Sequence, residues 1–296
     1  MVGSSCWRLL KKNGYKNLIG RNSSDLNLTN QKDVETFFLQ EKPDAVINAA
    51  AKVGGIFANT QYPYQFLMDN MQIQNNLINS SLNNNVSKFI FLGSSCIYPK
   101  HADQPLKENY LLSGPLEQTN QWYAIAKISG VKLIESIRKQ FGHDYISLMP
   151  TNLYGPGDNY NLETSHVLPA MIRKFYEAKQ NKSDSVLLWG SGTPLREFLH
   201  VDDLAQAIIL KLSSESSNSI YNVGSGEEIS IKNLAIKIQR VIGYKGKIVW
   251  DNSKPDGTPR KLLDSSLISQ LGWRSKINLD EGIRLTYEDF LKNLTN

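Results

Sequence analysis

Two kinds of segment alternate along this chain, and their order is the strongest constraint on its fold. Short apolar runs predict strands at residues 16–19, 45–49, 88–92 and 145–150. Longer segments with helical spacing of apolar residues predict helices at 31–40, 63–82 and 122–140. Such alternation is typical of βαβ units around a parallel sheet. We therefore predict an α/β fold with a Rossmann-like, doubly wound parallel sheet.

The beginning of the chain departs from that pattern. A dinucleotide-binding sheet opens with an apolar strand and a glycine-rich turn, because glycines let the backbone approach a pyrophosphate at a helix amino end. Here a helical segment follows Met1 directly, and only Gly3 fits the turn. We predict that the first strand and most of the glycine turn are missing. Two explanations stay open: a start site that omits about ten residues, or a chain that lacks the strand.

Charge and cysteine content exclude several classes of protein. The net charge is +5, but lysine and arginine are scattered, which argues against a nucleic-acid or membrane patch. Cys6 and Cys96 are the only cysteines, and no zinc-binding spacing surrounds them. No segment has the length of a transmembrane helix or the form of a signal peptide. We expect a metal-free, cytoplasmic protein.

Composition changes after Gly155, which indicates a second lobe. Gly, Pro, Asn and Asp cluster at 152–161, 190–194 and 254–261, and these segments are predicted as loops. Ligands bind at loops beyond the carboxyl ends of parallel strands. We predict a nucleotide-binding domain of residues 1–160 and 195–225. A smaller α/β substrate lobe would contain residues 161–194 and 226–296.

A Tyr-x-x-x-Lys pair, Tyr123 and Lys127, lies on the predicted helix 122–140. Positions four apart share one helix face. A phenol titrates near pH 10, and a neighbouring ammonium makes it a better acid–base catalyst. The pattern alone is weak, because a solvated helix face is by far the more common explanation for it. Ser94 strengthens it, since it follows a buried strand and can hydrogen-bond a substrate carbonyl beside Tyr123.

Cys96 and His166 extend this triad towards a second kind of chemistry. An isolated cysteine is usually core filler and a loop histidine is usually structural. Two residues beyond Ser94, however, the Cys96 thiol would face the same crevice. A thiol can remove a proton next to a ketone, and His166 can supply the matching acid. We predict that these five side chains converge on one substrate.

Seven long and irregular segments together resemble GDP-L-fucose synthases, which are extended short-chain dehydrogenases/reductases. They occur in that family's order over nearly the whole chain. The segments are NAAAKVGGI (48–56), LGSSCIYP (92–99), TNQWYAIAK (119–127), PTNLYGPGDNYN (150–161), SHVLPA (165–170), WGSGTPLREFLHVDDLA (189–205) and KPDGTPRKLLD (254–264).

The resemblance implies a role for each matching residue. The catalytic residues would be Ser94, Cys96, Tyr123, Lys127 and His166. Residues implied to bind the cofactor, NADPH or NADP⁺, are Gly3, Arg21, Ala49, Ala50, Lys127, Pro150, Asn152, Leu153 and His166. Residues implied to bind the GDP-sugar are Lys174, Trp189, Arg196, Lys254 and Lys261.

The implied activity is epimerisation at C3 and C5, then NADPH-dependent reduction at C4, of GDP-4-keto-6-deoxy-D-mannose to GDP-L-fucose. The implied assembly is a homodimer built through a four-helix bundle. Two alternatives stay open: another nucleotide-sugar epimerase or reductase of the same fold, and a non-catalytic dinucleotide-binding protein. Of the basic residues expected after the second strand only Arg21 is present. With the first strand missing we expect that the chain folds poorly or binds NADPH weakly, and tight NADPH binding in calorimetry would contradict this expectation.

Overall fold

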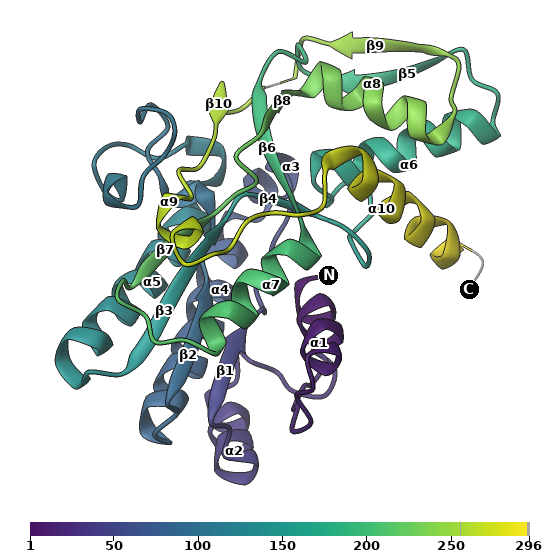
Figure 1. Ribbon diagram of the computed structural model, residues 1–296. Coiled ribbons are helices and arrows are strands. Elements are labelled where there is room, and N and C mark those ends of the chain that lie inside the picture. The colour runs from purple at the N-terminus through teal and green to yellow at the C-terminus, as the bar shows by residue number, and fades with distance from the viewer. Residues whose placement is uncertain (255, 295–296) are drawn as a thin grey trace.

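Four parallel strands form the main sheet of the protein, seen in a computed structural model that describes residues 1–254 and 256–294 (Figure 1). Their order across the sheet is β1-β2-β3-β7. The strands are β1 (Ala45–Asn48), β2 (Lys88–Leu92), β3 (Asp144–Pro150) and β7 (Ile220–Val223). The predictions at 45–49, 88–92 and 145–150 are confirmed, with their ends displaced by at most one residue.

The predicted strand at 16–19 is wrong, because these residues form no regular structure. A strand needs a hydrogen-bonding partner, and among the described residues β1 pairs only with β2. The first element of the chain is instead the helix α1 (Val2–Lys12). Leu18 is partly buried and still packs against the apolar core, as Ile47 does. Ile19, the other apolar residue of the segment, is 42% exposed, so the prediction was wrong about burial as well as backbone pairing.

One face of the sheet is covered by α2 (Gln31–Glu41), α4 (Pro63–Asn83) and α5 (Gln121–Phe141). These helices confirm the predictions at 31–40, 63–82 and 122–140. Local signals fix their ends: the Asn30 side chain accepts hydrogen bonds from the first-turn amides of α2. Gly142, in the left-handed conformation, ends α5.

The opposite face is covered by α1, α7 (Val201–Leu212) and α9 (Ser266–Ser269). Leu9 of α1 and Leu204 of α7 pack with Ile90 and Ile146 of the sheet. Burial of apolar side chains from both layers is the main favourable term for this packing. The sheet is therefore sandwiched between helices, as a doubly wound fold requires.

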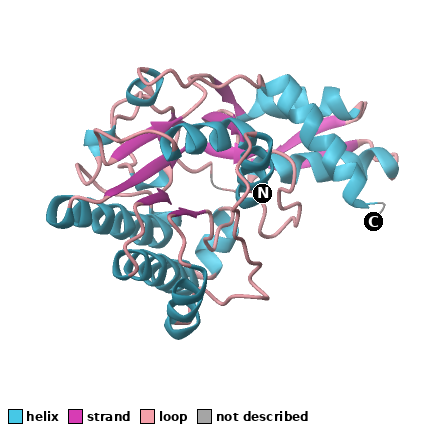
Figure 2. Cartoon of the chain, turned by 60° about the horizontal axis from the view of Figure 1, so that its bottom comes forward, coloured by secondary structure: helices cyan, strands magenta, loops and turns pink. Residues whose placement is uncertain are grey.

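A second lobe lies apart from the main sheet, at the upper right of Figure 1. It contains a parallel pair, β5 (Ser185–Trp189) and β9 (Lys247–Asp251), and the helices α6 (Val167–Gln180), α8 (Ile231–Ile242) and α10 (Leu279–Leu294). The lobe has a core of its own around Phe175, Leu234 and Phe290. Figure 2 shows its helices grouped to one side of the molecule.

A small mixed sheet connects the two lobes. In it β6 (Leu195–His200) pairs with β4 (Asn152–Tyr154), β8 (Glu228–Ser230) and β10 (Arg260–Lys261). Two loop predictions need correction, because 152–161 begins with β4 and 254–261 ends with β10. Both strands form on β6, a partner distant in sequence. Residue 255, within the second segment, lies outside the described residues; 190–194 is a loop, as predicted.

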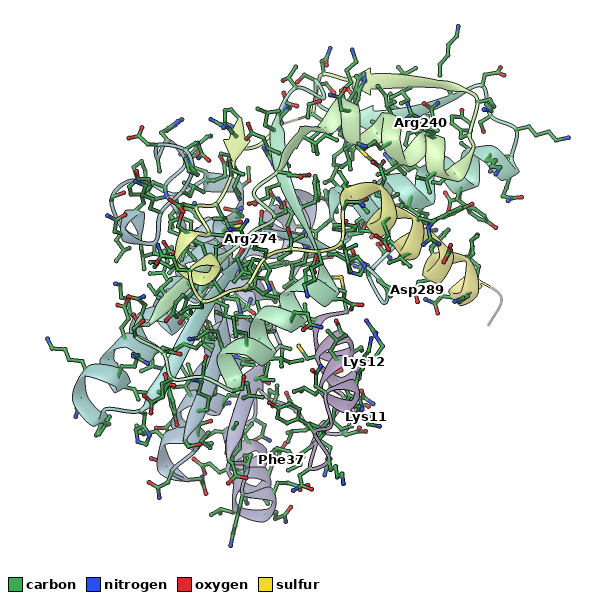
Figure 3. All side chains as sticks on the ribbon, viewed as in Figure 1. Lys11, Lys12, Phe37, Arg240, Arg274 and Asp289 are labelled. Atoms are coloured by element: carbon green, nitrogen blue, oxygen red, sulfur yellow. The ribbon has the colours of Figure 1, made fainter. Side chains whose placement is uncertain are left out.

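Basic side chains are dispersed over the surface. Lys11 and Lys12 lie on α1 and Arg240 on α8, well separated in Figure 3. In the described part of the chain no helix is long and apolar enough to cross a membrane. Nor do His, Cys, Asp and Glu side chains there form a group that could hold a metal ion.

Candidate active site

Ser94 and Cys96 lie directly beyond the carboxyl end of β2. Ser94 precedes the short 3-10 helix η1 (Ser95–Ile97), and its hydroxyl accepts a hydrogen bond from the Cys96 amide at 3.2 Å. This turn directs both residues to the edge of a parallel sheet where ligands bind. The structure thus places them where the sequence predicted.

Tyr123 and Lys127 lie on α5 and face the same edge. The Tyr123 phenol lies close enough to the Ser94 hydroxyl for the serine to lower its pKa. Lys127 is 3% exposed, and its Nζ donates to the carbonyl oxygen of Leu92 at 2.8 Å. The same Nζ lies 5.8 Å from the centre of the Tyr123 ring. The predicted Ser-Tyr-Lys triad is therefore assembled.

Burial controls the protonation of this triad. It raises the pKa of Tyr123, the negative charge of Cys96 adds to that effect, and the Ser94 hydroxyl opposes it. Burial also lowers the pKa of Lys127 to about 7, because the ammonium loses its hydration. Tyr123 is consequently a protonated phenol at neutral pH, suited to donating a proton, while Lys127 exists in both charged and neutral forms.

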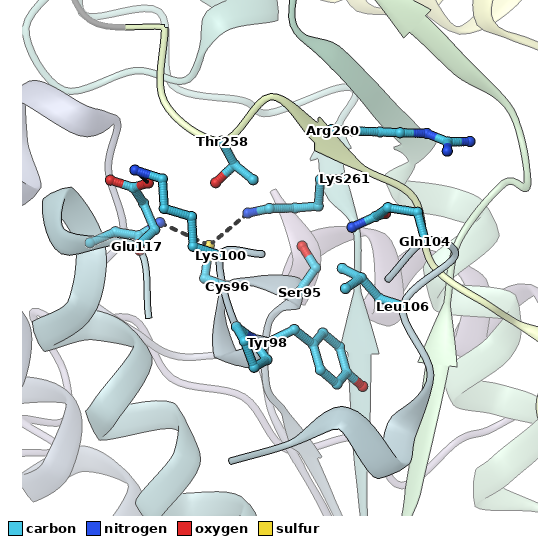
Figure 4. A pocket seen from close by; sticks show the side chains of 12 residues that line it. Ser95, Cys96, Tyr98, Lys100, Gln104, Leu106, Glu117, Thr258, Arg260 and Lys261 are labelled. Atoms are coloured by element: carbon cyan, nitrogen blue, oxygen red, sulfur yellow. Dashed lines mark hydrogen bonds and ion pairs between the residues drawn. The ribbon is translucent and has the colours of Figure 1, made fainter. Parts of the chain in front are cut away.

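The Cys96 sulfur accepts two hydrogen bonds. Asn120 Nδ2 lies 3.3 Å from Sγ and Lys261 Nζ lies 3.5 Å from it, as the dashed lines in Figure 4 mark. Both partners are polar groups that donate to the sulfur, so Cys96 is not surrounded by apolar side chains alone. The surroundings of Cys96 therefore suit a base better than core filler.

The pocket beside Cys96 is lined by charged groups from three parts of the chain (Figure 4). Lys100 Nζ lies 2.8 Å from Glu117 Oε2, and Lys261 reaches in from β10. Sequence reasoning did not identify Asn120, Lys100 or Glu117 as site residues. For Asn120 a signal existed, because it precedes Tyr123 by three positions, the spacing of one helical face.

His166 stands at the start of α6. Part of the residue is exposed. The protein around the imidazole ring removes hydration from its charged form and so lowers its pKa, and the positive charge of Lys261 lowers it further. The amide of Gly55 donates to the carbonyl of Thr164 at 3.1 Å, which ties this segment to the loop after β1. Lys261 thus acts on both Cys96 and His166, although His166 is not among the residues lining the Cys96 pocket.

A second group of predicted residues surrounds Trp189, at the end of β5. The indole is 50% exposed, with Lys254 Nζ 5.3 Å and Lys174 Nζ 5.9 Å from its centre. Lys174 also donates to the carbonyl of Leu187 at 3.0 Å. An exposed aromatic face between two cations suits a flat ring that carries anionic groups. The structure therefore separates Lys254, at Trp189, from Lys261, at Cys96.

Arg196 on β6 lies next to Lys261, the lysine that is hydrogen-bonded to Cys96. It is the register partner of Lys261, and its Nη2 donates to the carbonyl of Asp256 at 3.3 Å. Burial lowers its pKa, whereas the charges of Cys96, Asp256 and Glu117 oppose that shift. A planar guanidinium in this place suits bidentate binding of phosphate.

Most residues expected to bind the cofactor lie at the carboxyl edge of the main sheet. Ala49 and Ala50 follow β1, Pro150 ends β3, and Asn152 and Leu153 begin β4. A Cβ placed on Gly3 would lie 3.8 Å from Ala49, so the start of α1 adjoins this edge. Small side chains and a helix amino end fit a dinucleotide.

Arg21 is the exception among these residues. Its guanidinium is paired with Glu41 at the end of α2 and stacks over Phe37, 5.4 Å from the ring centre. One Nη2 donor is used by Glu41 and one Nη1 donor by the Gly20 carbonyl, so a phosphate at Arg21 would share the guanidinium with these partners.

Known proteins resemble the chain along its whole length. Residues 1–224 match the model of the NAD dependent epimerase/dehydratase family. GDP-L-fucose synthase 1 from Arabidopsis thaliana is 54% identical, over 100% of this chain and 92% of that protein.

Solved structures agree with the match. A GDP-6-OMe-4-keto-L-xylo-heptose reductase from C. jejuni has a TM-score of 0.94 and 36% identity, covering 99% of this chain and 95% of its own. A GDP-L-fucose synthetase from Naegleria fowleri bound to NADP has a TM-score of 0.91 and 30% identity, covering 100% and 91%. The chain therefore belongs to the NAD dependent epimerase/dehydratase family, and within it to the GDP-L-fucose synthases.

Proposed function

We propose that the protein converts GDP-4-keto-6-deoxy-D-mannose into GDP-L-fucose, by epimerisation at C3 and C5 and reduction at C4 with NADPH. One observation carries this proposal. The Cys96 sulfur, hydrogen-bonded by Asn120 and Lys261, adjoins the reductase triad: the Cys96 amide donates to the Ser94 hydroxyl, and the Cys96 charge acts on the pKa of Tyr123. A carbonyl reductase alone needs the triad, whereas a base beside it adds proton exchange.

Epimerisation follows from the acidity that the C4 ketone gives to the C–H bonds on C3 and C5. Cys96, as thiolate, takes the proton from one face of the ring and leaves an enolate, whose oxygen the hydroxyls of Ser94 and Tyr123 stabilise. We assign to His166 the donation of a proton to the opposite face. The imidazole and thiol then exchange protons with water, so the pair can act at both carbons without a metal.

Reduction removes the ketone and makes the epimerised product permanent. When bound, NADPH supplies the hydride to C4. Tyr123 protonates the C4 oxygen while Ser94 holds that oxygen by a hydrogen bond. Lys127, beneath the Tyr123 ring, supplies positive charge as the phenolate forms. The residues present fit a dinucleotide at the carboxyl edge, where we assign it to Gly3, Ala49, Ala50, Lys127, Pro150, Asn152, Leu153 and His166.

The GDP moiety would extend from Arg196 towards Trp189. We assign the diphosphate to Arg196, and a position beside the Trp189 indole, flanked by Lys174 and Lys254, to the remainder of the nucleotide. Lys261, predicted to bind substrate, would reach the sugar from the Cys96 side. This arrangement supports the division into a nucleotide-binding domain (1–160, 195–225) and a substrate lobe (161–194, 226–296).

A homodimer would use the outer faces of α4 and α5, which pack on each other. Tyr64 and Met68 of α4 and Trp122 and Ile125 of α5 are exposed there. Two copies meeting on these faces would form a four-helix bundle and cover the apolar side chains. The two unpaired cysteines fit our assignment of the enzyme to the reducing cytoplasm.

Turnover of purified protein tests the activity directly. With saturating NADPH, we expect NADPH oxidation and formation of GDP-L-fucose from GDP-4-keto-6-deoxy-D-mannose, and little turnover of UDP- or dTDP-linked keto sugars. Equal turnover of those sugars would favour another epimerase or reductase of the fold. Absence of NADPH oxidation with every sugar would favour a non-catalytic dinucleotide-binding protein.

A further inference from the structure

Glu197 is a completely buried carboxylate that neither the triad nor the binding residues account for. It is 0% exposed, on β6 beside Arg196. One carboxylate oxygen accepts the Gly226 amide at 2.7 Å, and the other accepts the Leu263 amide at 3.1 Å. The backbone carbonyl of Glu197 accepts a hydrogen bond from the side-chain Nδ2 of Asn152 at 2.8 Å. Three segments distant in sequence therefore meet at this residue.

The segment that Glu197 holds is the one that carries Lys261. Leu263 follows β10, a strand of two residues that pairs Lys261 with Arg196. So short a strand has few hydrogen bonds of its own, and its position depends on the anchors beside it. On its other side the segment is held by the Gln104 side chain, which accepts the Leu262 amide at 2.9 Å, and by two backbone hydrogen bonds with Leu106. Glu197 is the charged group among these anchors.

The chain also makes room for this carboxylate. A Cβ on Gly224 would lie 2.3 Å from one of the Glu197 carboxylate oxygens, so a larger residue there would displace the anchor. Burial raises the pKa of Glu197, and the amides of Gly226 and Leu263 oppose that shift. Two backbone donors suit an ionised carboxylate, because a protonated oxygen would direct its own hydrogen at a donor.

We propose that Glu197 is a positioning residue, whose carboxylate anchors residues 261–263 so that the Lys261 ammonium stays beside the Cys96 sulfur. Glu197 acts through Lys261 and touches neither substrate nor NADPH. This inference rests on the proposed function, in which Cys96 is the base of epimerisation. It predicts that loss of the anchor weakens Cys96 as a nucleophile while the Ser94-Tyr123-Lys127 triad stays intact.

Alkylation of Cys96 by iodoacetamide measures this effect without substrate or cofactor, because the thiolate is the reacting form. Cys6 interferes little, since it is buried and burial raises its pKa to about 12. We expect Glu197→Gln and Lys261→Met each to slow alkylation near neutral pH by about two- to fivefold, the size of a partly exposed charge interaction. The double variant should be no slower than Lys261→Met, because both changes remove one interaction.

Asp203→Asn is the matched control. Asp203 is also buried, and its carboxylate accepts the amides of Lys276 and Ile277, at 3.1 and 3.0 Å. Its replacement should lower stability but leave the alkylation of Cys96 unchanged. Glu197→Asp keeps the charge with a shorter side chain, and an intermediate rate is expected; this variant serves if Glu197→Gln does not fold.

Three results would each overturn the proposal: wild-type alkylation rates in both Glu197 variants, equal slowing in Asp203→Asn, or additive effects of Glu197→Gln and Lys261→Met. Failure of the proposed function is seen separately, as absence of turnover in the wild-type protein. If turnover is present, Glu197→Gln should slow solvent proton exchange at C3 and C5 more than reduction at C4.

Discussion

Replacing Lys127 with methionine should stabilise the folded protein at neutral and acidic pH while abolishing most of its activity. The amine is buried, and burial lowers its pKa from 10.5 to about 7. Each pKa unit corresponds to about 1.4 kcal/mol, so keeping this ammonium in the fold costs about 5 kcal/mol below pH 7. Methionine removes that cost but leaves the Leu92 carbonyl without its donor, a loss of about 1 kcal/mol.

The sign of the pH dependence follows from proton uptake. Between about pH 7 and pH 10.5 the unfolded chain binds a proton at Lys127 that the folded protein does not, so wild-type stability rises with pH. From about pH 6.5 to pH 9.5 the free-energy cost of burying the Lys127 amine should fall by about 3 kcal/mol in the wild type. Lys127→Met has no amine at this position and should lack this part of the pH dependence. The gain from the substitution should therefore be large at the lower pH and small at the higher one.

Urea unfolding of both proteins at these two pH values gives the comparison. Lys132→Met, on the same helix but with a partly exposed amine paired to Glu135, is the control and should show no such pH dependence. A Lys127→Met protein that is less stable than the wild type at about pH 6.5, with an unchanged pH slope, would refute the reasoning.

Three further predictions concern the site and the assembly. Tyr123→Phe should lower kcat for NADPH oxidation by about 10²- to 10⁴-fold, the usual contribution of a general acid, with NADPH affinity in calorimetry nearly unchanged. A mild loss of kcat would mean that another group donates the proton. Trp189→Ala should raise KM for the GDP-sugar by about tenfold with little change in kcat, because stacking of a base on an aromatic ring contributes about 1–3 kcal/mol. An unchanged KM would place the nucleotide elsewhere. Tyr64→Glu should shift sedimentation from dimer towards monomer, whereas Leu39→Glu on α2, 64% exposed against 66% for Tyr64, should not; equal effects would contradict an α4–α5 interface.

Local sequence patterns were sufficient to predict the central architecture. Apolar runs at 45–49, 88–92 and 145–150 matched strands because buried parallel strands are apolar on both faces. The segment at 16–19 has only two apolar residues, Leu18 and Ile19, and no strand formed there, since pairing also depends on a neighbour that the segment itself does not encode. Similarly, β4 and β10 lie in segments rich in Gly, Pro, Asn and Asp, which predicted loops. Both strands form because β6 provides a partner for their backbone hydrogen bonds.

Single residues of the site were predictable where their own chemistry and spacing identified them. Ser94, Tyr123 and Lys127 meet as expected, because one strand end and one helix face place them. The separation of Lys254 from Lys261 and the anchoring by Glu197 were not predictable. Both depend on how the 254–264 segment crosses from the small lobe to β6, which no local pattern records.

Solvent proton exchange by Cys96→Ser tests the central claim, that a thiol base and a reductase triad share one substrate. In D₂O without NADPH, the wild-type protein should introduce deuterium at C3 and C5 of the keto sugar. The variant should lose at least about 100-fold of that rate, because serine is a far weaker base. It should still oxidise NADPH when given the sugar already epimerised. Exchange at the wild-type rate in Cys96→Ser, or equal loss of exchange and reduction, would contradict the two-step account.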